Sequence, residues 1–126
     1  MRILLDTHIL LWWLTNDRRL PSKARQLIES PRNIVAVSSA SIWEIAVKRA
    51  LGKIKIELPE LEEAILNSGF EPLPITFRHA VEVSTLPAHH HDPFDRMLVA
   101  QCIVETARLL THDHTLNRYG KVVMIM

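Results

Sequence analysis

The sequence predicts one α/β domain, residues 1–126, with a central, mainly parallel sheet and helices on both of its faces. Short apolar runs alternate along the chain with longer segments whose apolar residues recur at helical spacing, which is typical of a parallel sheet. The length of 126 residues fits one compact domain, and a hydrophobic content of 48% is enough to build its core.

The first half of the chain contains two predicted strands, each followed by helices. Arg2–Leu5 is a short apolar run that stops at an acid, and Ile34–Val37 is short, apolar and mostly β-branched, so both are expected to be buried strands. Ser22 is expected to cap the second helix, and Gly52 and Gly69 are expected to end the third and fourth. The four helices are expected over Thr7–Leu14, Lys23–Ser30, Ser38–Leu51 and Pro59–Leu66.

The second half repeats the alternation. Pro72–Ile75 is expected to be extended, because proline restricts the backbone of the residue before it. Thr76 is expected to cap the next helix, which ends at about Thr85. Asp92 is expected to cap the helix after that, since Pro93 then takes the first helical position, where its missing N–H is not needed. The remaining elements are that helix, to about Ala107, and the strands Leu109–Thr111 and Val122–Ile125.

Four acids that are far apart in sequence are predicted to meet at one edge of this sheet. Parallel sheets place their sites at the carboxyl ends of the strands. Asp6 ends the first strand, and Asp113 follows the Leu109 strand. Glu44 is expected in the first turn of the helix after the second strand, and Asp95 in the first turn of the helix that leads to the Leu109 strand.

Three of these acids also have a purely structural explanation. Asp6 could cap the helix that follows it. Ser41 and Glu44 have the spacing of a capping box, so the glutamate could simply bond the backbone of the serine. Asp113 could be an ordinary turn residue. The predicted convergence, rather than any one position, favours a site.

Asp95 is the acid that a structural role explains least well. Leu98, Val99 and Cys102 lie three, four and seven residues beyond it, so Asp95 extends the apolar stripe of its helix. A carboxylate on that stripe must be paired, protonated or bound to a cation. The sulfur of Cys102 is interpreted as part of the core.

Four neighbouring carboxylates favour divalent cations. They raise one another's pKa values and so destabilise an empty site at neutral pH, a conflict that a cation removes. Magnesium and manganese prefer oxygen ligands, and magnesium is commonly held by a few carboxylates together with substrate phosphate oxygens. One or two such ions can activate water and stabilise the charge that builds on a phosphodiester. The residue types therefore indicate metal-dependent phosphodiester hydrolysis.

Four segments carry a family resemblance: Leu4–His8, Ser41–Lys48, His91–Gln101 and Leu110–Asp113. Over nearly the whole chain, their order and spacing resemble the PIN-domain ribonucleases, and specifically the toxins of VapC-type toxin–antitoxin pairs. The stretch Asp-Pro-Phe-Asp-Arg followed by Leu-Val-Ala-Gln is the most specific part. The resemblance implies a PIN-like three-layer fold, a magnesium or manganese site, RNA cleavage that leaves 5′-phosphate and 3′-hydroxyl ends, a small cognate antitoxin and a homodimer.

The resemblance also assigns residues. Thr7 and Thr111 match positions near the site, where a hydroxyl can bond a carboxylate or a water. Lys48 lies one helical turn from an acid and Arg96 follows another, so both are candidate phosphate contacts. The residues that the resemblance implies to be both catalytic and metal-binding are Asp6, Glu44, Asp95 and Asp113.

Histidines are frequent around these motifs. His89, His90 and His91 are consecutive and could in principle bind zinc, but neighbouring side chains diverge, whereas zinc requires ligands that converge tetrahedrally. We interpret the run as a solvated loop beside the site. His8 and His112 fill positions where relatives vary, which bears on RNA preference more than on the chemistry. Of the adjacent Trp12 and Trp13, one is expected in the core and the other could line a partner groove.

Charge and composition constrain the partners and the compartment. The net charge is only +1, but without the four acids the chain has fifteen basic residues against ten acidic ones, which suits contact with RNA phosphates. The longest apolar stretch, Ile9–Leu14, is too short to cross a membrane, and no secretory signal is apparent. A single cysteine excludes an intrachain disulfide, so a cytoplasmic protein is expected.

Two other classes of protein share some of these features. A receiver-type phosphoacceptor has a similar length and an acid after its first strand, but it requires a second acid there and a lysine after a late strand. A catalytically idle PIN-like module would chiefly bind an antitoxin and take part in repressing its own operon. The retention of all four acids favours an enzyme over the idle module.

Overall fold

A five-stranded sheet in which every pairing is parallel forms the centre of the computed structural model, which describes residues 1–89 and 91–126. The strand order is β3-β2-β1-β4-β5. Both the predicted fold class and the parallel sheet are confirmed. The strands are β1 (Arg2–Leu5), β2 (Ile34–Ser38), β3 (Glu71–Leu73), β4 (Arg108–Thr111) and β5 (Val123–Ile125).

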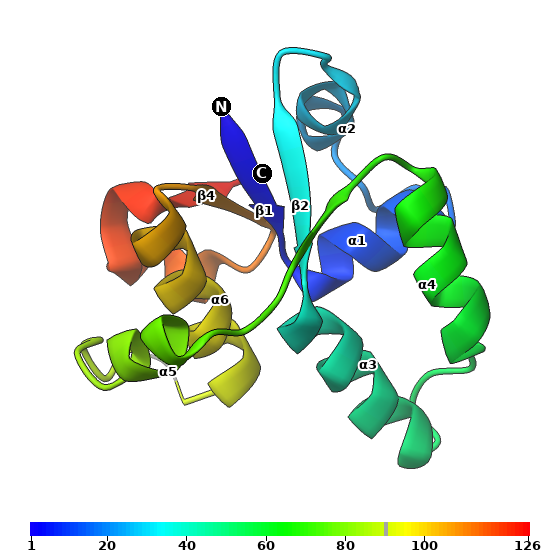
Figure 1. The fold of residues 1–126 in the computed structure, drawn as a ribbon. Coiled ribbons are helices and arrows are strands. Elements are labelled where there is room, and N and C mark those ends of the chain that lie inside the picture. Colours follow the sequence, from blue (N-terminus) through cyan, green and yellow to red (C-terminus); the bar gives the residue numbers. More distant parts are fainter. Residues whose placement is uncertain (90) are drawn as a thin grey trace.

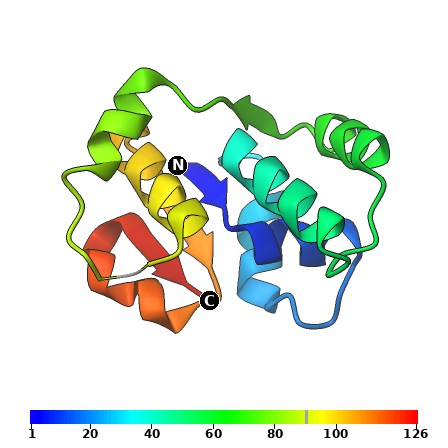
Figure 2. The same cartoon turned by 90° about the horizontal axis from the view of Figure 1, so that it is seen from below.

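Helices cover both faces of the sheet. One core cluster packs the sheet against α1, α2 and α4, and a second packs it against α6 and η1. Figure 1 shows α1, α2 and α4 on one side of β1 and β2, with α5 and α6 on the other, and Figure 2 shows the same division from below. The helices are α1 (Thr7–Leu14), α2 (Ser22–Glu29), α3 (Ser39–Ala50), α4 (Leu58–Asn67), α5 (Phe77–Val83), α6 (Pro93–Glu105) and the 3₁₀ segment η1 (His114–Val122).

The strand order also separates this chain from a receiver-type protein. Receiver domains have the order 2-1-3-4-5, whereas here the second and third strands extend the sheet on one side of β1 and the fourth and fifth on the other. The phosphoacceptor hypothesis is therefore wrong.

No helix in the two described ranges is both long enough and apolar enough to cross a membrane.

Several local predictions about where helices begin and end were wrong. Ser22 does not cap α2: it is the first helical residue, because the extended backbone of Pro21 already supplies the turn into the helix. Glu44 lies in the second turn of α3 rather than the first, since the helix begins at Ser39. The last long helix ends at Glu105, two residues before the predicted Ala107. At Thr106 the backbone is left-handed, with φ of 54°, and this stops α6.

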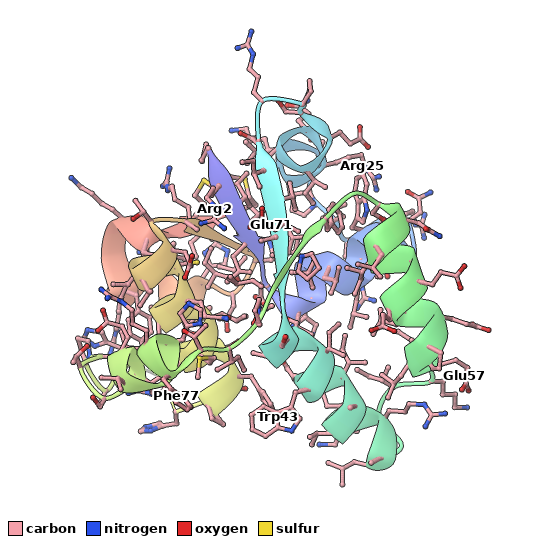
Figure 3. All side chains as sticks on the ribbon, in the orientation of Figure 1. Arg2, Arg25, Trp43, Glu57, Glu71 and Phe77 are labelled. Carbon is pink, nitrogen blue, oxygen red and sulfur yellow. The ribbon has the colours of Figure 1, made fainter. Side chains whose placement is uncertain are left out.

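A polar network that the sequence did not reveal joins the sheet to α5 and α6. Arg2 forms ion pairs with Glu71 at 2.6 Å and Glu105 at 3.4 Å, and Figure 3 labels Arg2 and Glu71 beside the sheet. Glu105 also lies 2.8 Å from Nε2 of His79, which is fully buried. The hydrogen bond from His79, and then those from Arg2, hold the pKa of Glu105 below its usual value despite partial burial.

A hydrogen bond at the other ring nitrogen of His79 shows which nitrogen donates to Glu105. Nδ1 accepts a hydrogen bond from the backbone N–H of Thr76 at 3.0 Å, so it carries no proton and Nε2 is the donor to Glu105. The network continues through Gln101, which accepts a 2.5 Å bond from the hydroxyl of Ser38 at the end of β2. The network thus links α5 and α6 to the strand that leads into α3.

Candidate active site

A cleft of about 970 Å³ lies beyond the carboxyl ends of β1 and β4. Because Leu5 of β1 pairs with Leu110 of β4, the residues that follow these strands emerge side by side. Three of the four predicted acids line the cleft and the fourth, Asp6, is buried behind it. The lining residues are His8, Glu44, Lys48, His89, His91, Asp92, Asp95, Asp113, His114, Thr115, Asn117 and Arg118.

Asp6 faces the neighbouring strand rather than its own helix. It is the N-cap residue of α1, yet its side chain makes no capping hydrogen bond. Its carboxylate instead accepts a short hydrogen bond from the hydroxyl of Thr111, and only 4% of the residue is exposed. Burial raises the pKa of Asp6 above its ordinary value, although the bond from Thr111 opposes this. Holding Asp6 ionised therefore costs folding free energy.

This cost predicts that the Asp6→Asn variant is more stable than the wild type without metal. Asparagine can still accept the bond from Thr111 but carries no charge to desolvate. We expect a gain on the order of 1 kcal/mol, or about 4 °C in Tm, measured by calorimetry in EDTA. The gain should shrink as the pH falls through the raised pKa, because protonated Asp6 is also neutral.

The matched control is Glu63→Gln, which removes a charge from the exposed face of α4. It should leave the melting temperature unchanged. A destabilised Asp6→Asn variant, with Glu63→Gln at the wild-type value, would contradict the account of Asp6.

Glu44 is held by a hydroxyl and an ammonium group. It is 3% exposed, accepts a 2.7 Å hydrogen bond from Thr7 and forms a 2.5 Å ion pair with Lys48 one turn along α3. The capping-box interpretation of Glu44 is wrong, because the cap of α3 is Ser38, whose hydroxyl accepts from the backbone N–H of Ala40. Glu44 is therefore positioned by a tertiary contact with Thr7 and by an ion pair within its own helix.

Asp95 lies in the first turn of α6, as predicted, and its backbone is fixed by a cap. Asp92 is the N-cap, and its carboxylate accepts from the backbone N–H of Phe94 at 2.8 Å and of Asp95 at 3.2 Å. Pro93 takes the first helical position, as expected. The cap sets where α6 begins, and therefore where Asp95 meets the cleft.

Asp113 combines a place in the cleft with a capping role. Its carboxylate accepts from the backbone N–H of Thr115 at 2.9 Å and from the hydroxyl of the same residue at 2.6 Å. Its own N–H donates to the hydroxyl of Thr111 at 3.0 Å. Asp113 therefore does have the turn role that the sequence suggested. Thr111 links it to Asp6, because its hydroxyl bonds both residues.

The donor set of the cleft fits a hard divalent cation. Glu44, Asp95 and Asp113 line it, Asp6 lies behind it, and Cys102, the single cysteine, is buried elsewhere, in the core. Taken by themselves, the four acids are oxygen donors, which suit magnesium or manganese, whereas the four histidines that also line the cleft are nitrogen donors. Within residues 1–89 and 91–126, no three histidine, cysteine, aspartate or glutamate side chains are already drawn together as a coordination shell. A cation would have to draw them closer.

The two basic residues singled out from the sequence have different surroundings. Partial burial lowers the pKa of Lys48, but its bond to Glu44 and the nearby Asp92 and Asp95 outweigh this and raise it. Lys48 is therefore a cation held among the acids of the cleft. The guanidinium of Arg96 instead donates to the carbonyl oxygens of Pro87 and Val83 at 3.1 and 3.2 Å. To contact a phosphate, Arg96 would have to keep these two hydrogen bonds and use its remaining N–H groups, or give the two bonds up.

Histidines form much of the rim. His8, His89, His91 and His114 line the cleft, which agrees with a solvated loop beside the site for the two loop members. His90 lies outside the described residues. Sequence reasoning did not assign His114, Asn117 or Arg118 to the site. The signal available was weak, because they follow Asp113 in a short 3₁₀ segment that is interrupted by the non-helical backbone of Gly120.

The chain is similar to known proteins over most of its length. A family model described as "PIN domain" matches residues 3–122. Ribonuclease VapC22 of Mycobacterium tuberculosis is 30% identical over 123 residues, which cover 93% of this chain and 91% of that protein.

Solved structures agree in fold. A structure of VapBC2 from Rickettsia felis, bound to a DNA fragment from its promoter, matches with a TM-score of 0.68 and 17% identity, covering 100% of this chain and 98% of that one. VapBC-1 from nontypeable Haemophilus influenzae matches with a TM-score of 0.67 and 18% identity, covering 100% and 97%.

Proposed function

Because this chain belongs to the PIN-domain family, we propose that it is a divalent-metal-dependent endoribonuclease and the toxin of a type II toxin–antitoxin pair. The VapC-type ribonuclease with 30% identity supports the RNA substrate. The match over residues 3–122 supports treating the whole chain as one PIN domain. We further propose that it acts in the cytoplasm, where a toxin would meet cellular RNA.

The observation that carries the proposal is that three acids from separate elements line one cleft, with a fourth, Asp6, buried behind it. Asp6 follows β1, Glu44 lies on α3, Asp95 begins α6 and Asp113 follows β4. Burying and crowding carboxylates costs folding free energy, and a bound cation would offset that cost. We propose that these four hold magnesium or manganese and are the catalytic residues.

The chain's own residues have distinct roles in this proposal. Bound magnesium or manganese would supply a Lewis acid that activates water and offsets the charge developing on the phosphodiester. Thr7 and Thr111 donate hydroxyl hydrogen bonds to Glu44 and Asp6, which orients those carboxylates. Lys48 carries a positive charge at the cleft wall, where it can meet a phosphate oxygen. Arg96 supports the site by tying the chain at Val83 and Pro87 to α6.

We also propose a small antitoxin as partner, together with a homodimer. The similar VapBC structures support the antitoxin. A small apolar groove between α3 and α4, lined in part by Ile42, Ile65 and Leu66, offers a place for an apolar segment of it. Trp43 on α3 is 58% exposed, and Leu51, the residue that ends this helix, is 65% exposed. Figure 3 labels Trp43 beside the N-terminal half of α3. Exposed large apolar side chains of this kind suit a second copy of the chain.

Controlled expression in a bacterial host tests the toxin, the nuclease and the partner together. Induction should stop growth and create new RNA ends within minutes, as mapped by sequencing of RNA termini. Co-expression of the short protein encoded beside this chain should restore growth and co-purify with it. Induction of the Glu44→Gln variant should neither stop growth nor create new RNA ends. Induction of Glu63→Gln should have the same effects as the wild type.

The idle-module alternative predicts a different result. Folded, abundant protein that leaves both growth and RNA ends unchanged, while still binding the neighbouring short protein, would overturn the ribonuclease proposal. In that case the domain would act by antitoxin binding and operon repression.

A further inference from the structure

A buried hydrogen bond joins the start of α3 to the second half of α6. The hydroxyl of Ser38 donates to the side-chain oxygen of Gln101 at 2.5 Å, and both residues are fully buried. The same hydroxyl accepts from the backbone N–H of Ala40 at 2.9 Å and thereby caps α3. Ser38 thus fixes the first turn of one helix and is bonded to the side of another.

The amide of Gln101 has a single orientation that satisfies its neighbours. Its nitrogen lies 3.3 Å from the carbonyl oxygen of Pro74 and 3.4 Å from Nδ1 of His79. The carbonyl oxygen can only accept, and Nδ1 carries no proton, so the amide nitrogen donates on this side and the amide oxygen faces Ser38. Because hydrogen bonds are directional, this arrangement holds the Ser38 hydroxyl in one position.

Each of the two helices joined by this bond carries an acid of the candidate site. Glu44 lies six residues after Ser38 on α3, and Asp95 lies six residues before Gln101 on α6. Both acids line the cleft, whereas Ser38 and Gln101 do not. The hydrogen bond therefore lies behind the cleft wall and makes no contact with a molecule that enters the cleft.

A second contact joins α3 and α6 beside the two acids. The ring of Trp43 on α3 meets the ring of Phe94 on α6 edge-on, with ring centroids 4.9 Å apart. Figure 3 shows Trp43 on the side of α3 that faces α6. These two aromatic residues directly precede Glu44 and Asp95 in the sequence. Contacts at two separate positions restrain the angle between the helices, which a single contact would leave free.

Stability alone does not explain why the buried pair is polar. Burying a polar group costs free energy that its hydrogen bond offsets, and replacing both partners by apolar groups of the same shape can be nearly neutral. An apolar pair would pack without requiring one orientation, whereas a fully satisfied polar network makes a core rigid and specifies one arrangement. The Ser38–Gln101 bond therefore contributes orientation to the packing of α3 on α6.

We propose that the hydrogen bond between Ser38 and Gln101 positions Glu44 relative to Asp95, so that carboxylates from two different helices can reach the same divalent cation. Ser38 and Gln101 are positioning residues, because they act through the two acids and touch neither substrate nor metal. This inference rests on the proposed metal-dependent ribonuclease and adds two residues to its site. A misplacement of about 1 Å caused by a distant substitution can cost about 100-fold in rate.

The first test requires neither metal nor activity. Gln101→Met keeps the length of the side chain and the helix propensity but offers Ser38 only a weak acceptor, and Ser38→Ala removes the donor. In ¹⁵N NMR spectra of the metal-free protein, Gln101→Met should shift the amide signal of Glu44, and Ser38→Ala should shift that of Asp95. Shifts confined to the helix that carries each substitution would overturn the proposal.

The second test measures cleavage and metal binding. Gln101→Met and Ser38→Ala should each lower kcat for a labelled RNA roughly tenfold and weaken manganese binding several-fold. KM for the RNA should stay at the wild-type value, because neither residue lines the cleft. The double variant should be no slower than Ser38→Ala alone, since both substitutions break the same bond. Ser38→Thr retains the hydroxyl and should keep the wild-type rate.

Ile28→Val is the matched control for lost stability, because Ile28 is a core residue on α2, which carries none of the four acids. It should lower the melting temperature without changing kcat or manganese binding. If Ser38→Ala fails to fold, Gln101→Met carries the test, because it leaves the cap of α3 in place.

The outcomes distinguish this proposal from the proposed function. Folded Gln101→Met protein with wild-type kcat and wild-type manganese affinity would overturn the positioning role, and so would effects that multiply in the double variant. A wild-type protein that neither cleaves RNA nor binds manganese would overturn the proposed function instead. In that case the NMR shifts would still decide whether the bond positions Glu44 relative to Asp95.

Discussion

Replacing Asp95 by asparagine should lower metal-dependent RNA cleavage by more than about 100-fold, because removing even an indirect partner of a metal ligand commonly costs 10- to 100-fold. Asp95 lines the cleft from the first turn of α6, where Asp92 fixes the start of the helix. Asparagine has almost the same shape but supplies a neutral ligand. The measurement is the initial rate of cleavage of a labelled RNA with magnesium and with manganese.

Folding and metal binding serve as controls for Asp95→Asn. Its melting temperature in EDTA should stay close to that of the wild type, since the cap from Asp92 does not involve the Asp95 side chain. Calorimetric titration should show weaker manganese binding than in Glu63→Gln. Wild-type cleavage rates in a folded Asp95→Asn variant would remove Asp95 from the catalytic site.

The second large effect concerns stability: His79→Leu should cost about 2–3 kcal/mol of unfolding free energy, or about 10 °C in Tm. His79 is fully buried, accepts from the backbone of Thr76 and bonds Glu105. Leucine fills a similar volume but removes both the acceptor of the Thr76 N–H and the buried donor to Glu105. Thermal and urea unfolding measure the loss.

A second substitution distinguishes loss of the hydrogen bonds from disturbed packing. His79 holds the third helical position of a capping box, where glutamine is common. His79→Gln can keep the bond to Thr76, so it should recover part of the stability that His79→Leu loses. Equal stability of His79→Leu and wild type would show that the network contributes nothing measurable.

Glu105 determines how the stability difference between wild type and His79→Leu should depend on pH. Its pKa is lowered mainly by the bond from His79, so the interaction contributes stability above the usual glutamate range that is lost as the pH falls through the lowered pKa. The stability gap between wild type and His79→Leu should therefore narrow in acid. A gap that widens below the usual glutamate range would show that Glu105 is not the coupled group.

The sequence predicted the sheet and most helices because their signals are local. Apolar runs such as Ile34–Val37 and caps such as Thr76 and Asp92 are readable from neighbouring residues alone. The 3₁₀ segment η1 was not predicted, since it consists of short pieces interrupted by the non-helical backbone of Gly120. The early end of α6 was missed because Thr106 is an uncommon residue for a left-handed backbone.

The candidate site was located from topology, but the orientation of its side chains was not. The sequence places Asp6 after a strand. Only the pairing of β1 with β4 sets Thr111 beside it and turns its carboxylate away from the helix. Likewise, the place of Glu44 depends on Thr7, which is 37 residues away in the chain. From the sequence, Arg96 was expected to be available for a phosphate. In the structure its guanidinium instead donates to carbonyl oxygens of the preceding segment.

The chemistry of the RNA ends tests the central claim, hydrolysis at the carboxylate cleft, most directly. Four histidines line the same cleft, and imidazoles could instead catalyse attack by the RNA's own 2′-hydroxyl. Water attack assisted by a divalent cation should give 5′-phosphate and 3′-hydroxyl ends, and EDTA should abolish the products. Products with 2′,3′-cyclic phosphate and 5′-hydroxyl ends that persist in EDTA would contradict the account and assign the reaction to the histidines.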